Sequence, residues 1–210
     1  MLAPILFAAL TNFSGAVDMN EDEYRLYCGY LDELGKPEIQ KLSGSKRDKA
    51  IAGKAKVKPA VLLAAVAKGE KAGSTCAEIG KRAEADTKAA LETALPGRIN
   101  VVTLDFSDPS HVVALVSWSG IDKKKVVEEA AAIAYAIADQ AKLTKTIAIR
   151  AVDPAATDKT ADEAMWWEAK ITHGQASRID KTKIADYATT RYLRLFDGCK
   201  TTLENGCAIK

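Results

Sequence analysis

The sequence changes its hydrophobic periodicity at Pro96-Gly97, and this change divides the chain into two parts of different secondary structure. Before the dipeptide, apolar side chains recur at helical spacing through residues 18–95, as at Tyr24, Tyr27 and Leu31. After it, residues 98–197 alternate between short strand-like runs and helical runs. This order predicts an α+β fold, in which an all-helical domain at 17–96 precedes a domain built on a sheet.

The second part reads as two strand–strand–helix units. A ββαββα order most economically gives a two-layer domain with a four-stranded, mainly antiparallel sheet and both helices on one face. We therefore predict such a domain over 98–197, followed by a cysteine-containing tail at 198–210. The predicted strands cover residues 99–106, 111–118, 146–152 and 165–172, and the predicted last helix covers 180–196.

Residues 1–16 differ from the rest of the chain. No charged side chain occurs from Met1 to Phe13, and small residues stand at Ser14 and Ala16, the −3 and −1 positions of a cleavage site. We interpret residues 1–16 as a signal peptide cleaved after Ala16, although no Lys or Arg precedes the apolar run. The alternative is a buried N-terminal helix. No later apolar run is long enough to predict an integral membrane segment in the mature chain.

Four cysteines bear on the cellular compartment. None lies in a C-x-x-C pair, which is atypical of a zinc or thioredoxin-like site. Cys199 and Cys207 could close a small loop in the tail, and Cys28 and Cys76 would then join two N-terminal helices. The alternative is four reduced, partly buried thiols. Because disulfides persist in oxidising compartments, the paired reading agrees with a periplasmic or secreted protein.

A basic segment at residues 46–66 resembles a helix-turn-helix, a resemblance to the motif and to no family. A small residue stands at Ala52, and residues 41–83 contain eleven Lys or Arg against three acids, a local charge of +8. Such a basic patch is typical of phosphate binding, with Lys56 and Lys58 as contacts. However, Lys56 occupies the turn position usually held by Gly, and the second helix offers almost no polar side chain to base edges. Apolar side chains fill the five positions that the motif requires, namely Ile51, Ala55, Val57, Leu62 and Ala65.

Catalytic and cofactor motifs are not found. The two histidines are His111 and His173, and although Ser110 adjoins His111, neighbouring residues on a strand point to opposite faces. The sequence contains no glycine-rich phosphate loop, EF-hand loop or His-x-x-x-His pair. We therefore predict no catalytic residue, no metal site and no cofactor.

The adjacent pair Trp166-Trp167 lies within a predicted strand, so one of the two rings must leave the main core face. By alternation, Trp166 shares its face with Glu168 and Lys170, and with Arg150 of the preceding strand. An aromatic ring among charged groups is typical of a contact hot spot, which makes Trp166, Arg150 and Lys170 candidate binding residues. Alternatively, helices or the aliphatic stems of Lys and Arg cover the ring.

These observations predict an exported, noncatalytic protein that binds a macromolecular partner or forms part of an envelope or extracellular assembly. The alternative is a cytoplasmic nucleic-acid-binding protein that uses the helix-turn-helix-like segment with Lys56 and Lys58.

Overall fold

A computed structural model describes residues 17–108, 111–156, 163–184, 189–204 and 207. The predicted signal peptide at 1–16, the turn residue Pro109 and Ser110 lie outside the described residues. From residue 17 onward, where the structure describes the chain, helices alone precede the first strand, as the sequence predicts. They are α1 (Glu21–Leu34), α2 (Pro37–Gln40), α3 (Gly44–Lys54), α4 (Pro59–Ala72) and α5 (Cys76–Ala94).

Local sequence signals set the starts of these helices. Asn20 and Glu23 form a capping box at the start of α1, and Thr75 and Glu78 form another at the start of α5. Pro59 opens α4, where its missing N–H costs no helical hydrogen bond. In the preceding turn, Lys56 adopts a left-handed backbone with φ 56°, the conformation that glycine usually supplies in a helix-turn-helix.

Three tyrosines form the buried side of α1. The hydroxyl of Tyr24 donates to the carbonyl of Cys76 over 3.2 Å, and that of Tyr27 donates to the carbonyl of Gly73 over 3.2 Å. The hydroxyl of Tyr30 reaches Asp48 of α3 over 3.5 Å. Each tyrosine ring is buried and its hydroxyl is hydrogen-bonded to another helix or its end, so the three residues together hold α1 against α3, α4 and α5.

Two disulfides are present, and both pairings agree with those predicted. Cys28 of α1 bonds Cys76 at the start of α5, and Cys199 bonds Cys207 in the tail. No cysteine is left free. The first bond therefore reinforces the contact that the tyrosines make between α1 and the start of α5.

The described residues form a sheet of five strands in the order β1-β2-β3-β4-β5, so the prediction of a four-stranded sheet is wrong in number. β2 and β3 are parallel and are connected through α6 (Val126–Gln140), whereas the other neighbours are antiparallel. The sheet is therefore mixed. The strands are β1 (Ile99–Asp105), β2 (Val113–Ser119), β3 (Thr146–Val152), β4 (Met165–Thr172) and β5 (Asp197–Thr201).

The C-terminal region accounts for the difference. Asp197–Thr201 pairs with β4 instead of following a long helix, and Gly198, which resembles a helix-ending glycine, has φ 63° within an irregular strand pairing. In place of one helix over 180–196, the described residues of this range form two short helical pieces, and a third short helix precedes them. The two pieces are η1 (Lys181–Lys183) and α8 (Thr189–Leu193), the preceding helix is α7 (His173–Ala176), and residues 185–188 lie outside the described ranges.

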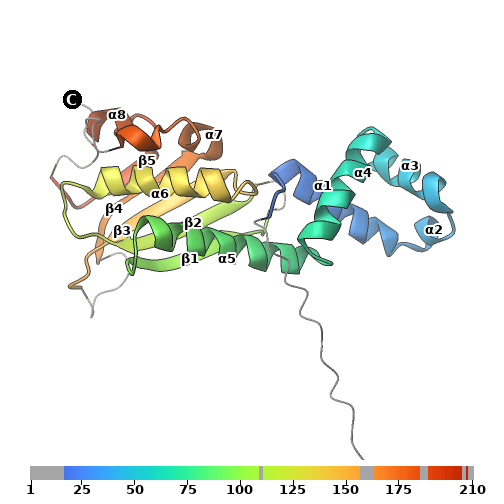
Figure 1. The fold of residues 1–210 in the computed structure, drawn as a ribbon, viewed down its shortest axis with the longest axis horizontal. Coiled ribbons are helices and arrows are strands. Elements are labelled where there is room, and N and C mark those ends of the chain that lie inside the picture. The colour runs from blue at the N-terminus through green and yellow to red at the C-terminus, as the bar shows by residue number, and fades with distance from the viewer. Residues whose placement is uncertain (1–16, 109–110, 157–162, 185–188, 205–206, 208–210) are drawn as a thin grey trace, which may run out of the picture.

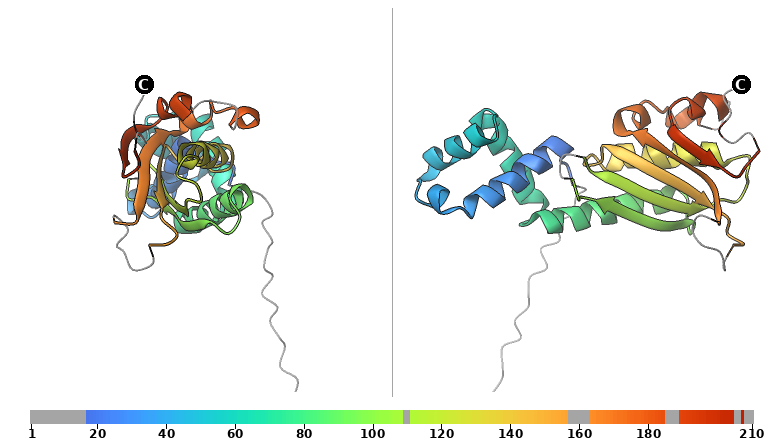
Figure 2. Two further views of the ribbon diagram at one scale, coloured as in Figure 1. Left: turned by 90° about the vertical axis from the view of Figure 1, so that its left-hand side faces the viewer. Right: turned by 180° about the vertical axis from the view of Figure 1, so that it is seen from behind.

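The helices α5 and α6 lie on one face of the sheet, and the short C-terminal helices extend this layer (Figure 1). Trp118 and Trp167 point into the core between sheet and helices and are fully buried. The view from behind shows the other face with no described helix across it (Figure 2, right). The sheet is therefore covered on one side, and we call its uncovered side the open face.

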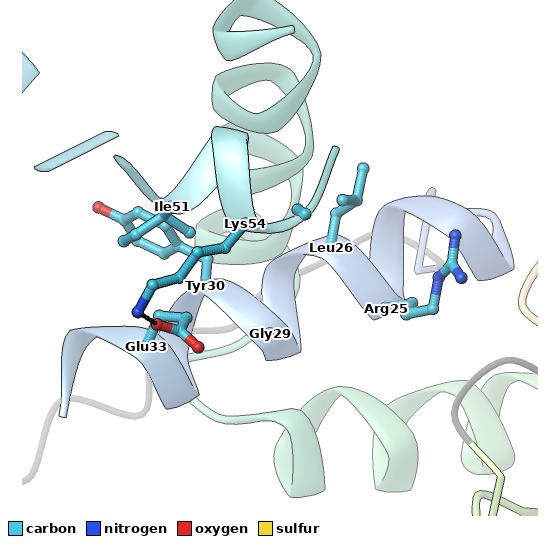
Figure 3. A pocket seen from close by; sticks show the side chains of 8 residues that line it. Arg25, Leu26, Gly29, Tyr30, Glu33, Ile51 and Lys54 are labelled. Atoms are coloured by element: carbon cyan, nitrogen blue, oxygen red, sulfur yellow. Dashed lines mark hydrogen bonds and ion pairs between the residues drawn. The ribbon is translucent and has the colours of Figure 1, made fainter. Parts of the chain in front are cut away.

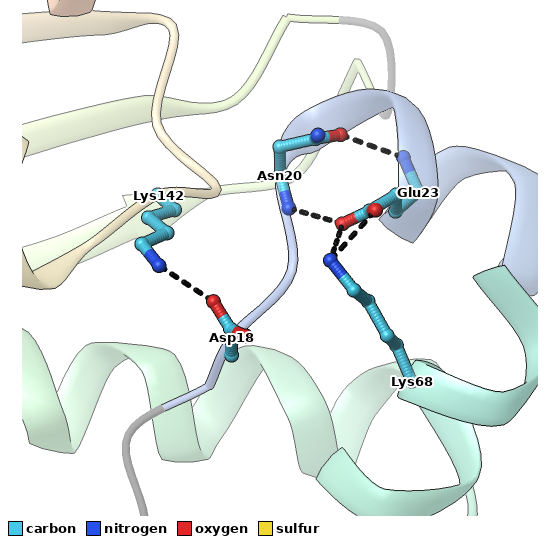
Figure 4. Close-up of polar contacts among 5 residues, drawn as sticks. All are labelled: Asp18, Asn20, Glu23, Lys68 and Lys142. Carbon is cyan, nitrogen blue, oxygen red and sulfur yellow. Dashed lines mark hydrogen bonds and ion pairs between the residues drawn. The ribbon is translucent and has the colours of Figure 1, made fainter. Parts of the chain in front are cut away.

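Residues 17–20 connect the helical part to the sheet part. The buried Val17 donates its N–H to Asp86 of α5 over 3.0 Å, and Asp18 pairs with Lys142, which follows α6, over 2.6 Å (Figure 4). At the same place Lys68 of α4 reaches Glu23 over 2.8 Å. Among the described residues, no helix has the length and apolar character required to cross a bilayer.

Candidate interaction surface on the open face of the sheet

The direction of each side chain follows from strand alternation. In β3 the buried Ile147, Ile149 and Ala151 point toward the helices, so Ala148, Arg150 and Val152 point to the open face. The strand pairing extends this division to the other strands, because directly paired residues share a face.

One row of side chains crosses all five strands. Val101 pairs with Ser117, Ser117 with Arg150, Arg150 with Glu168, and Glu168 with Lys200. We call these five residues the central row. The row begins with an aliphatic side chain on β1 and ends with charged side chains on β3, β4 and β5, so the open face has an apolar half and a charged half.

The charged half is organised around Glu168. Arg150 donates from Nε to Oε2 of Glu168 over 2.6 Å and also contacts this carboxylate through its terminal nitrogen. Lys200 lies 3.7 Å from the other carboxylate oxygen. Two cations therefore share one half-buried anion, which fixes the carboxylate and leaves a net positive charge at the edge of the apolar half.

The apolar half contains an open groove of about 340 Å³. Val101 is 50% exposed and Leu115 is 42% exposed, although both lie within regular strands. Ala148 and Val152 continue the apolar lining, and Arg150 with Glu168 borders it. Because large aliphatic side chains are normally turned inward in a strand, their exposure side by side is typical of a contact surface.

The sequence-predicted residues Arg150 and Lys170 both lie on this face, and Lys170 is exposed two positions from Glu168. Trp166 lies at the end of the surface, where the pairing of β3 with β4 shifts between Ala151 and Val152. Its half-buried ring packs on the backbone of Gly120, and Lys123 approaches the ring at 5.3 Å. The structure therefore places Arg150 and Lys170 on the same face of the sheet and Trp166 at its margin.

The other two predicted binding residues, Lys56 and Lys58, are exposed in the turn between α3 and α4, in the helical part that lies away from the sheet (Figure 1). The structure does not bring them together with Trp166, Arg150 and Lys170. They belong to a separate surface.

A second groove, of about 280 Å³, lies between α1 and α3 (Figure 3). Leu26 and Ile51 provide apolar lining, and Glu33 pairs with Lys54 at one end over 2.7 Å. Hydrogen bonds from Lys36 and Lys54 hold the pKa of Glu33 below its ordinary value. Since this carboxylate is already neutralised by its own lysines, the groove is a weaker candidate than the open face.

The histidines do not form a nucleophilic arrangement within the described residues. Nδ1 of His173 lies 3.5 Å from the hydroxyl of Thr144, and burial lowers the pKa of its imidazole. Nε2 of His111 lies 3.0 Å from the hydroxyl of Thr146. In the part of the chain that the structure describes, no three His, Cys, Asp or Glu side chains converge to hold a metal ion.

Sequence reasoning missed Val101 and Leu115, which give the open face its apolar half. No local signal marked them, because Val101 stands beside Val102, and Leu115 stands between Ala114 and Val116, so apolar side chains point to both faces of each strand. Recognising the pair required the antiparallel register of β1 with β2, which brings the two side chains to the same face.

The fold and this surface define an α+β protein whose mixed sheet is covered by helices on one face and presents a part-apolar, part-charged open face. Comparisons of the chain with protein-family models, with curated proteins and with solved structures find no match. Its function is therefore argued from the surface itself.

Proposed function

We propose that this chain is an exported, noncatalytic protein that binds a macromolecular partner through the open face of its sheet. The observation that carries the proposal is the groove in which Val101 and Leu115 are exposed beside the Arg150–Glu168 ion pair. An apolar centre next to fixed charges is the arrangement of a specific protein interface, where apolar contacts supply affinity and charges supply orientation.

Several features support a protein or envelope component as the partner. The groove is open along the strands, which suits an extended or flat partner surface better than an enclosed small molecule. Trp166 and Lys170 can extend the contact beyond the groove, because both lie along β4. Desolvation of Val101 and Leu115 would favour binding, since each now exposes apolar area to water.

Export is supported by the two disulfides, which an oxidising compartment maintains. The surroundings of Val17 are compatible with cleavage after Ala16. Its backbone nitrogen already lies 3.0 Å from the Asp86 carboxylate. Cleavage there would convert this N–H into an α-ammonium group and the contact into a charge-assisted hydrogen bond.

The protein isolated from its native host should begin at Val17 and should not react with a thiol reagent unless it is first reduced. N-terminal sequencing and intact mass measurement with and without reductant test both points together. Protein that begins at Met1 and carries four reactive thiols would contradict export and favour the cytoplasmic alternative.

Replacing Val101 and Leu115 together by glutamate should weaken partner binding by at least about tenfold, because the charges would have to be buried in the apolar half of the interface. A photo-crosslinking residue at position 117, in the central row, would identify the partner in the extracytoplasmic fraction. Titration with the purified partner would then give the dissociation constants of wild type and variant.

The matched control is Ile121→Glu, which places the same charge on an exposed aliphatic residue outside the groove. This variant should bind as wild type does. Trp166→Ala should weaken binding while the variant still folds, with a thermal midpoint below that of wild type because the packing on Gly120 is lost. If Val101→Glu/Leu115→Glu binds the crosslinked partner with unchanged affinity, the open face is not the binding surface.

A further inference from the structure

Helix α4 has an unusual composition for a helix at the surface. From Pro59 to Ala67 it contains no polar side chain at all. Its inner side is buried against α1 and α3 through Leu62, Ala65 and Val66. A helix that is apolar all round is normally buried on all sides. In α4 only the inner side is buried, so the apolar side chains of its outer side are exposed to water.

The outer side of α4 forms a continuous apolar stripe. Val61 is 48% exposed and Leu63 is 45% exposed. Val61 and Leu63, two positions apart, lie at opposite margins of the exposed side. The exposed alanines at 60, 64 and 67 are three or four positions from one or other of them, so they lie between the two and complete one apolar surface. We call this stripe the α4 outer face, and its members are Ala60, Val61, Leu63, Ala64 and Ala67.

Cationic side chains stand at both ends of the α4 outer face. Lys56 and Lys58 precede the stripe, and Lys71 follows Ala67 by one helical turn. All three are exposed, and no carboxylate of the described residues forms an ion pair with them, in contrast to Lys54 and Lys68. The one acid in residues 54–72 is Glu70.

We propose that the α4 outer face docks the protein onto an anionic lipid surface. A bilayer offers apolar chains beneath a layer of negative headgroups, and the α4 outer face offers aliphatic side chains flanked by lysines. This site is independent of the open face of the sheet, and it explains why a helix-turn-helix-like segment carries a second helix without base-reading side chains.

The charge pattern argues against two other occupants. A second copy of the chain, placed face to face, would bring its own lysines against Lys56 and Lys58. A nucleic-acid duplex would lay phosphates over Val61 and Leu63. These phosphates would lose water without gaining a polar partner, which is unfavourable. An anionic bilayer offers negative headgroups to the lysines and apolar chains to the aliphatic side chains.

Cosedimentation with vesicles tests the proposal directly. The disulfide-bonded protein should bind vesicles of phosphatidylglycerol and phosphatidylcholine more strongly than vesicles of phosphatidylcholine alone, and added salt should weaken the binding. Lys56→Glu/Lys58→Glu should reduce the partition constant by at least about tenfold. Val61→Ser/Leu63→Ser should reduce it by about fivefold through the loss of buried apolar area.

All variants are compared in the same form of the chain, so any contribution of residues 1–16 is common to them. Ile121→Ser is the matched control, because it removes an even more exposed aliphatic side chain that also lies beside lysines, at positions 123–125. This control should bind the vesicles as wild type does, and thermal midpoints should confirm that the variants fold.

Three results would overturn the proposal. The first is equal binding to both kinds of vesicle. The second is unchanged binding by Val61→Ser/Leu63→Ser, or an equal loss in Ile121→Ser, since either would show that the α4 outer face is not the contact. The third is binding to duplex DNA at low salt without binding to either vesicle, which would assign Lys56 and Lys58 to nucleic acid.

Discussion

Replacing Cys28 and Cys76 together by serine should lower the free energy of unfolding by about 4 kcal/mol. The disulfide joins residues 48 positions apart, so it restricts a long loop in the unfolded chain, and the entropy of that restriction grows with loop length. Urea unfolding under non-reducing conditions, followed by tryptophan fluorescence and by circular dichroism, measures the loss.

The tail disulfide provides the control for this experiment. Cys199 and Cys207 are only 8 positions apart, and replacing both by serine should cost about 2.5 kcal/mol by the same reasoning. The Cys28→Ser/Cys76→Ser variant should therefore be the less stable of the two. Equal stability of the two variants would show that loop length does not govern the contribution of these bonds.

Gly69→Ala should destabilise the protein by about 2 kcal/mol, even though alanine is the better helix former. An alanine Cβ at position 69 would lie 2.2 Å from Cγ of Tyr27, well inside van der Waals contact. Tyr27 is buried and its hydroxyl donates a hydrogen bond to the carbonyl of Gly73. The ring can therefore move only by losing its packing and this hydrogen bond. The thermal midpoint and urea unfolding report this change.

Gly53→Ala is the matched substitution, because nothing lies within 4 Å of the added Cβ in α3. There the same change should stabilise the protein by about 0.5 kcal/mol. In a Tyr27→Ala background, Gly69→Ala should lose most of its cost, since the ring that it meets is gone. A cost of Gly69→Ala that persists without the ring would contradict this explanation.

Features with a local cause were predictable from the sequence. Thr75 followed by Glu78 has the spacing of a capping box, and α5 starts there; the alternation of Trp167, Ala169 and Ile171 with polar residues likewise indicates a sided strand, which is β4. The sequence also predicts Asp122 as the N-cap of the helix that follows the second strand, and this prediction is wrong. Asp122 accepts from the N–H of Lys124 in a turn, and the helix begins at Val126, so Asp122 is not its N-cap.

Features that depend on long-range pairing were not predictable from local patterns. β5 is a short run, Asp197–Thr201, whose strand character comes from its pairing with β4 about thirty positions earlier. Arg150 and Lys170 could be assigned to one face by alternation alone. The groove required the neighbouring placement of β2 and β3, which sets Leu115 beside Ala148.

α5 is an unbroken helix of 19 residues, about 28 Å long, that belongs to both parts of the molecule. Its first residue is bonded to α1, and further along it packs on β1 and α6. A hinge between α1–α4 and the sheet would have to bend about the Cys28–Cys76 bond and give up the hydrogen bonds that Tyr24 and Val17 donate to α5. The α4 outer face and the open face are therefore connected through α1, its disulfide and α5, and these links limit how far two ligands held on the two faces can move apart.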